Sequence, residues 1–123
     1  FMIVDTNNMS VFEQIKIFSG ADVIIGPTSS ALTNLVFCKK GTRVIEIIPK
    51  YKYDYENTFK NRYSKIGKYL KLNYMSIEAD PVKNVKLKVD TNKFISKKVL
   101  NESNYYKDLL IGVKKFEKII SDF

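Results

Sequence analysis

The sequence contains no histidine and only one cysteine, Cys38, among its 123 residues. Without histidine, the chain cannot itself supply a Ser-His-Asp triad, histidine acid–base catalysis or a His-ligated zinc site. A single cysteine cannot form an internal disulfide, and no histidine is present to activate it as a nucleophile. We therefore interpret Cys38 as a buried structural residue in a protein of a reducing compartment.

Long apolar runs are also missing. No stretch approaches the roughly 20 residues that a transmembrane helix needs, and we expect no signal peptide in these residues. Hydrophobic residues nevertheless make up 45% of the sequence, which favours a folded core at this length. We expect one cytoplasmic domain over residues 1–123. Because the chain begins inside an apolar run, we expect it to be a segment of a longer protein.

Charge is spread unevenly along the sequence. Residues 1–49 carry four basic and four acidic side chains, so the whole formal charge of +8 belongs to residues 50–123. A basic half could attract nucleic acid, an anionic membrane surface or an anionic substrate. Its lysines are mixed with acids, and no arginine cluster or stacking-aromatic pattern accompanies them. We expect a solvated face and no nucleic-acid partner, and we leave a peripheral contact with a membrane open.

Short apolar runs alternate with segments of helical periodicity. Strands are expected at residues 2–4, 23–25, 44–48, 74–77 and 85–89. Helices are expected at residues 10–20, 31–37, 57–70 and 90–100, with a closing helix in 101–123. This order is typical of an α/β domain in which helices cover both faces of a parallel sheet.

The first expected helix has recognisable ends. Ser10 and Glu13 have the spacing of a capping box, in which each residue satisfies the other's backbone N–H. Gly20 is suited to the position just past the last helical residue.

The most informative stretch lies near the middle of the first half. Residues 23–25 are three β-branched or apolar residues, and they predict a strand buried on both faces that Gly26-Pro27 interrupts. Thr28, Ser29 and Ser30 then precede the next helix. Hydroxyls beside the free N–H groups of a helix start form a favourable place for a phosphate. The simpler interpretation is that Ser29 or Ser30 caps the helix.

Glu46 lies within an otherwise apolar strand, at residues 44–48. A buried carboxylate without a partner is costly, so Glu46 must point out at the carboxyl end of its strand or find a hydrogen-bonding partner. In open α/β sheets the ligand crevice lies beyond the carboxyl ends of the strands, where Glu46 and the Thr28–Ser30 turn would meet. A salt bridge to one of the many lysines is an equally good interpretation.

A series of motifs extends over roughly residues 3–80. Its segments are residues 10–15, Phe18, 21–26, 31–37, Gly41 and 44–47. In this order they resemble the C-terminal half of glycosyltransferase family 61, which includes capsular polysaccharide biosynthesis proteins.

This resemblance implies a GT-B type enzyme, in which two Rossmann-like domains face each other across a cleft. The present chain would be most of the C-terminal, donor-binding domain, and the N-terminal domain would be missing. The family's turn reads His-Gly-Ala-Gly-Leu-Thr-Asn. Here Thr28, Ser29, Ser30 and Ala31 occupy its first four positions, while residues 32–34 match. The histidine and both glycines are therefore replaced, which restricts how closely a diphosphate can approach the backbone.

The function implied is glycosyl transfer from a nucleotide-sugar donor to a hydroxyl of a glycan or polysaccharide acceptor. Thr28, Ser29 and Ser30 would stabilise charge on the departing diphosphate. Asn34 would support the turn or reach the donor, and Glu46 would accept hydrogen bonds from ribose or sugar hydroxyls. No metal or other cofactor is expected, and a general base would come from the missing domain. The alternative is a non-catalytic domain that binds a nucleotide-sugar or a sugar phosphate.

Overall fold

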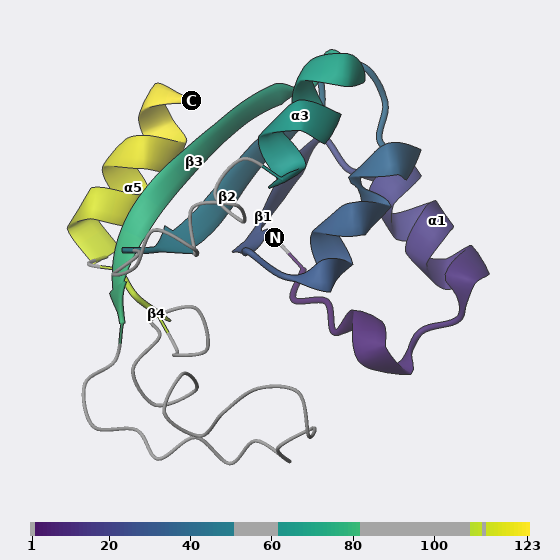
Figure 1. The fold of residues 1–123 in the computed structure, drawn as a ribbon, viewed down its shortest axis with the longest axis horizontal. Helices are drawn as coiled ribbons and strands as arrows, with labels where there is room; N and C mark the ends of the chain where they lie inside the picture. Colours follow the sequence, from purple (N-terminus) through teal and green to yellow (C-terminus); the bar gives the residue numbers. More distant parts are fainter. Residues whose placement is uncertain (1, 51–61, 82–108, 112) are drawn as a thin grey trace.

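A computed structural model describes residues 2–50, 62–81, 109–111 and 113–123 of the chain. Its centre is a sheet in the order β1-β2-β3-β4 (Figure 1). The strands β1 (Val23–Pro27), β2 (Arg43–Pro49) and β3 (Asn73–Pro81) are parallel, and β4 (Leu109–Leu110) pairs antiparallel with β3. The predicted α/β class is confirmed, as a Rossmann-like parallel sheet flanked by helices.

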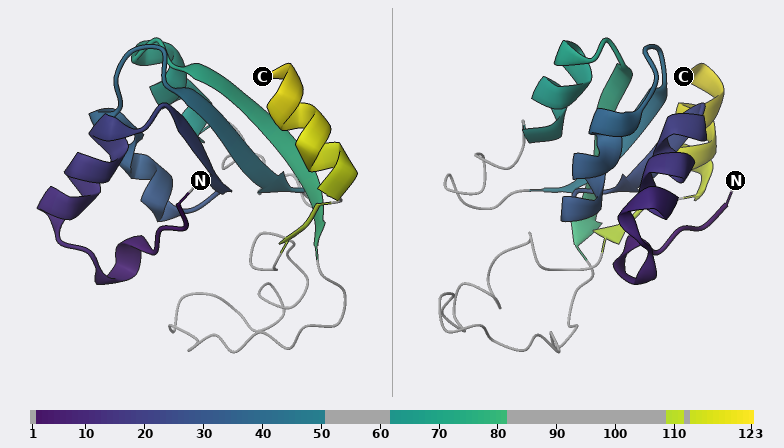
Figure 2. Two further views of the ribbon diagram at one scale, coloured as in Figure 1. Left: turned by 180° about the vertical axis from the view of Figure 1, so that it is seen from behind. Right: turned by 90° about the vertical axis from the view of Figure 1, so that its right-hand side faces the viewer.

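Two helical segments connect the parallel strands on one face of the sheet. The 3-10 helix η2 (Ser30–Phe37) joins β1 to β2, and α3 (Arg62–Tyr69) precedes β3. Right-handed crossovers between consecutive neighbouring strands put both connections on the same side. Helix α5 (Val113–Asp122) lies along β3 on the opposite side (Figure 2). Both faces of the sheet are therefore covered, as the sequence predicts.

The main core lies between the sheet and the helices η2 and α3 that cover one of its faces. Its buried side chains come from α1, η2, β2 and α3 and from the turn that leads into β3: Phe18, Leu32, Leu35, Val44, Tyr63 and Leu72. On β3 the residues alternate cleanly, since Ile77 and Ala79 are buried while Ser76 and Glu78 are exposed. This period of two directs Ile77 and Ala79 towards the α5 side, and Tyr74 and Ser76 towards the side of α3.

Helix α1 (Val11–Gly20) packs against η2 beside β1. The predicted capping box is confirmed: the hydroxyl of Ser10 accepts from the Glu13 N–H, and the Glu13 carboxylate accepts from the Ser10 N–H at 2.7 Å. Gly20 is the last helical residue, and Ala21 follows it in an extended conformation. The expectation that Gly20 lies past the helix end is therefore wrong by one position.

Several boundaries differ from those predicted. Residues 2–4 form no strand, because no described strand lies beside them, and Ile3 is fully exposed. The short 3-10 helix η1 (Thr6–Asn8) replaces the expected turn and begins with Asp5 accepting from the Asn7 N–H. The closing helix starts at Val113, since Leu109–Leu110 pair with β3 instead. The predicted strand 85–89 and helix 90–100 lie outside the described residues.

Candidate functional site

The hydroxyl-rich turn begins where β1 ends. The strand does not stop at Gly26-Pro27 as predicted, but continues through Pro27, and the Thr28 N–H donates to the Ile47 carbonyl at 2.9 Å. Proline is tolerated here because β1 is an edge strand among the described strands, and one side of its backbone needs no partner. For the same reason residues 23–25 are only partly buried, and not buried on both faces.

The three hydroxyl residues lie together at the carboxyl end of β1. Thr28 and Ser29 are partly buried and Ser30 is exposed, so the turn reaches the surface of the described structure. Ser29 is the N-cap residue of η2, yet its side chain makes no capping hydrogen bond. The simple capping role is therefore wrong for Ser29. Within the described part of the chain, the hydroxyls of all three residues make no hydrogen bond, and they are available to a ligand.

The helix that follows the turn is a 3-10 helix, and not the α-helix that its periodicity suggests. Its first backbone bond runs from the Leu32 N–H to the Ser29 carbonyl at 3.1 Å. The N–H groups of Ser30 and Ala31 precede that bond, and the start of a helix leaves such donors without an intrahelical partner. Donors and hydroxyls thus face the same end of the sheet, an arrangement that suits an anion.

Asn34 lies one turn further along η2 and contacts α1. Its amide donates to Oε1 of Gln14 at 2.6 Å, and the Gln14 amide donates to the Met9 carbonyl at 3.1 Å. Asn34 therefore fixes η2 against α1. This contact holds in place the helix that follows the hydroxyl turn. The sequence does not indicate this role of Gln14, because a lone helical glutamine gives no sign of a contact with a residue twenty positions away.

Glu46 is completely buried on β2. It lies in register between Gly26 of β1 and Ser76 of β3, on the same face as η2. The hydroxyl of Tyr74 donates to its Oε2 atom, while Oε1 has no partner among the described residues. Of the interpretations left open by the sequence, the hydrogen-bonding partner is confirmed. Glu46 does not point out of the strand end, and the described lysines form no salt bridge with it.

The position of Tyr74 depends on a glycine of α3. A Cβ atom at Gly67 would lie 2.9 Å from the Tyr74 Cβ, closer than side chains in folded proteins approach. The bare glycine lets α3 lie directly on β3, and the Tyr74 ring then extends along the sheet to the carboxylate of Glu46. The sequence predicts Tyr74 only as a strand residue. Its hydrogen bond to Glu46, diagonally across β3 and β2, becomes apparent only when the strand register is known.

Cys38 follows η2 and packs against the core, partly buried. Burial raises the pKa of its thiol to about 11, so the thiol stays protonated at neutral pH. This agrees with a structural role and gives no support to a nucleophilic one.

Residues 1–45 match the family model described as Glycosyltransferase 61. The matched stretch contains α1, β1, η2 and the first residues of β2, and therefore the whole hydroxyl turn and Asn34. No curated protein and no solved structure matches the chain. The resemblance noted from the sequence is thus supported at the level of the family, over a shorter stretch than residues 3–80.

Neither a membrane span nor a metal cluster is found in the described residues. None of their helices has the length and hydropathy needed to cross a bilayer. Nor do three acidic, cysteine or histidine side chains gather there in a way that could hold a metal ion.

Proposed function

We propose that this chain contributes the donor-binding domain of a glycosyltransferase, and that the Thr28–Ser30 turn binds the diphosphate of a nucleotide-sugar. The observation that carries the proposal is the set of three hydroxyls at the carboxyl end of β1 that make no hydrogen bond to a described residue, inside the stretch that matches the Glycosyltransferase 61 family. These groups stabilise the negative charge that develops on the departing diphosphate. The acceptor is a hydroxyl of a glycan or polysaccharide.

In this proposal Glu46 accepts a hydrogen bond from a ribose or sugar hydroxyl through Oε1. A buried carboxylate oxygen with no described partner invites a donor, since buried polar atoms are nearly always hydrogen-bonded. Because Glu46 has no exposed surface, a ligand reaches it only when the side chains that cover it move. Donor binding is therefore coupled to a rearrangement on the η2 face of the sheet.

The turn chemistry also favours a second candidate, a binding domain without turnover. Thr28 cannot carry a proton at neutral pH as the family's histidine can. The side chains of Ser29 and Ala31 fill space that glycines would leave to the diphosphate. Such a domain would still bind a nucleotide-sugar or a sugar phosphate through its hydroxyls.

Calorimetry on the full-length protein with UDP-, GDP- and CMP-sugars, followed by a hydrolysis assay, separates the two candidates. Binding with release of the nucleotide supports a transferase, and binding without it supports the non-catalytic domain. A variant with Ser29→Ala and Ser30→Ala should lose most of the affinity. Thr33→Ala is the matched control, because Thr33 is an exposed hydroxyl residue on the same helix. Equal affinity of both variants, or no binding by the parent protein, would contradict the proposal.

A further inference from the structure

The amino ends of the strands carry a second feature, separate from the hydroxyl turn. Two turns meet there, one between η2 and β2 and the other between α3 and β3. The Gly41 N–H donates to the Lys71 carbonyl and the Asn73 N–H donates to the Thr42 carbonyl, both at 3.0 Å. These bonds bring cations from both turns to one edge, which we call the basic edge: Lys39, Lys40, Arg43, Lys68 and Lys71.

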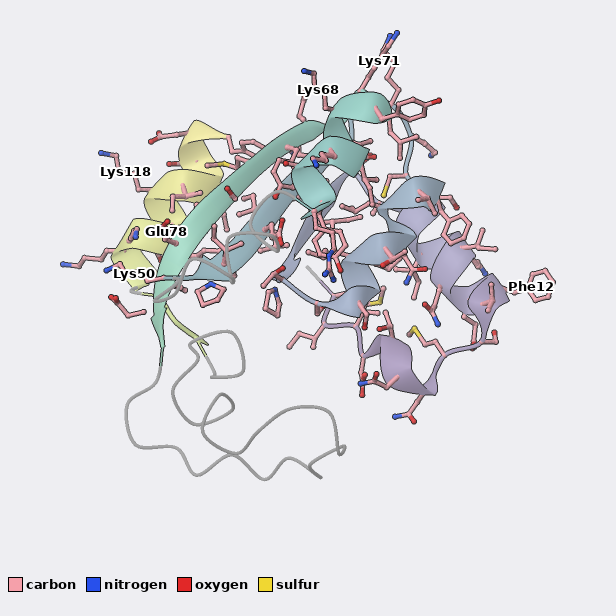
Figure 3. The ribbon with its side chains drawn as sticks, viewed as in Figure 1. Phe12, Lys50, Lys68, Lys71, Glu78 and Lys118 are labelled. Atoms are coloured by element: carbon pink, nitrogen blue, oxygen red, sulfur yellow. The ribbon has the colours of Figure 1, made fainter. Side chains whose placement is uncertain are left out.

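All five cations of the basic edge are exposed, and none forms an ion pair with another residue that the structure describes. Lys39, Lys40 and Arg43 line an open hollow of about 390 Å³, to which Asp22 contributes a single carboxylate. Figure 3 shows Lys68 and Lys71 extending from the same end of the molecule into solvent. The fold thus concentrates positive charge that the sequence distributes over two separate segments.

Lys71 has a backbone conformation that normally favours glycine. Its φ is 56°, in the left-handed region, just after the end of α3. The Leu72 N–H donates to the Gly67 carbonyl and the Lys71 N–H donates to the Lys68 carbonyl, the pair of bonds of a Schellman motif. The neighbouring turn has Gly41 at its left-handed position, with φ 86°. A lysine in this conformation is strained, and strain of this kind gathers at functional positions.

An aromatic residue completes the surface. Tyr69, the last residue of α3, is 87% exposed and lies between Lys68 and Lys71 in the sequence. A tyrosine with an apolar ring and a polar tip is suited to the boundary between lipid headgroups and acyl chains. Lysines around it complement the phosphates and carboxylates of anionic lipids.

We propose that the basic edge docks on an anionic membrane surface, with Tyr69 inserted at the level of the headgroups. The cations are four lysines and one arginine that lie in or directly beside the two turns. Such a set suits many diffuse charge contacts more than the bidentate base contacts that arginines make with nucleic acid. The hydroxyl turn lies at the opposite end of the parallel strands. Docking by the basic edge therefore leaves the hydroxyl turn open, and it does not depend on the function proposed for that turn.

The test is co-sedimentation of the full-length protein with phosphatidylcholine vesicles, with and without phosphatidylserine. The parent protein should bind only the anionic vesicles, and the binding should weaken as salt is raised. Lys71→Gly should lower the partition coefficient about fivefold, the effect expected for one cation near an anionic surface. Since glycine suits φ 56°, this variant should be at least as stable to heat as the parent protein, so a loss of binding cannot arise from unfolding.

Lys118→Gln is the matched control, because it removes the same charge from an exposed position on α5 (Figure 3). Tyr69→Ser should weaken vesicle binding without changing its salt dependence. Equal binding to neutral vesicles, or equal losses from Lys71→Gly and Lys118→Gln, would overturn the proposal. It would also be overturned if duplex DNA or RNA bound more tightly than anionic vesicles and displaced the protein from them.

Discussion

Tyr74 on β3 donates its hydroxyl hydrogen to Glu46 on β2, and this contact joins two strands inside a buried part of the sheet. The carboxylate has no exposed surface, and its other oxygen has no partner among the described residues. Among the described residues, Tyr74 is thus the one side chain that donates a hydrogen bond to Glu46. A buried acceptor that loses its partner bears the full cost of its desolvation.

We expect Tyr74→Phe to lower the free energy of unfolding by about 1–3 kcal/mol, since it leaves the Glu46 carboxylate buried and unpaired. Adding Glu46→Met, which has a similar shape and no charge, should recover part of that loss. Urea unfolding of the parent protein, both single variants and the double variant completes the cycle. Strictly additive effects would show that the two side chains are not coupled.

The order of strands and helices was predictable because short continuous apolar runs mark β1 and β2, and apolar residues at a spacing of about 3.6 mark α1. The role of Glu46 was open, because its partner lies on another strand and is fixed only by the register that pairs Glu46 with Ser76. Residues 2–4 were wrongly predicted as a strand. They have a high β propensity, but a strand forms only when a neighbouring strand offers hydrogen bonds.

The hydroxyl turn was located correctly from local signals, namely proline, three hydroxyl residues and the helix that follows. Those signals could not distinguish a 3-10 helix from an α-helix at η2, because Leu32 and Leu35 are three residues apart and fit both periods. The basic edge could not be found in the sequence either. It exists only because backbone bonds connect the turns around Gly41 and Lys71.

The close approach of α3 to β3 predicts opposite effects for two glycines. Gly67→Ala should destabilise the protein by about 1–3 kcal/mol, because the new Cβ would lie 2.9 Å from the Tyr74 Cβ and the helix would have to move. Gly20→Ala, in the last position of α1, has no atom within 4 Å of the new Cβ. This control should be neutral or more stable by up to about 1 kcal/mol. Thermal unfolding of both variants provides the comparison, and a stabilising Gly67→Ala would show that α3 is not fixed against Tyr74.

The thiol of Cys38 should react slowly in the folded protein. Its pKa is about 11, against 9.0 for a free thiol, so at pH 8 the thiolate is about 100-fold scarcer than in the unfolded chain. Labelling with a disulfide reagent in buffer and in urea measures this difference. In the native protein the rate should keep rising about tenfold per pH unit beyond pH 9, as expected when thiolate supply limits the reaction. A rate that levels off near pH 9 would show that the thiol is not desolvated.

The capping box of α1 predicts a stability effect that depends on pH. Ser10→Ala removes the side chain that accepts from the Glu13 N–H, and it should cost about 1 kcal/mol at neutral pH. Hydrogen bonds from the Ser10 hydroxyl and N–H lower the pKa of Glu13 below 4.5 in the folded protein. A carboxyl whose pKa is lowered on folding stabilises the protein above its unfolded value, and this contribution is lost as the pH falls through the folded value. The penalty of Ser10→Ala should therefore shrink when urea unfolding is repeated well below pH 4.5.

Ser19→Ala, near the other end of the same helix, should show no such change, because the Ser19 hydroxyl donates to the Lys16 carbonyl and contacts no titrating group. A Ser10→Ala penalty that stayed constant across this pH range would mean that the Glu13 carboxylate contributes nothing to the start of α1.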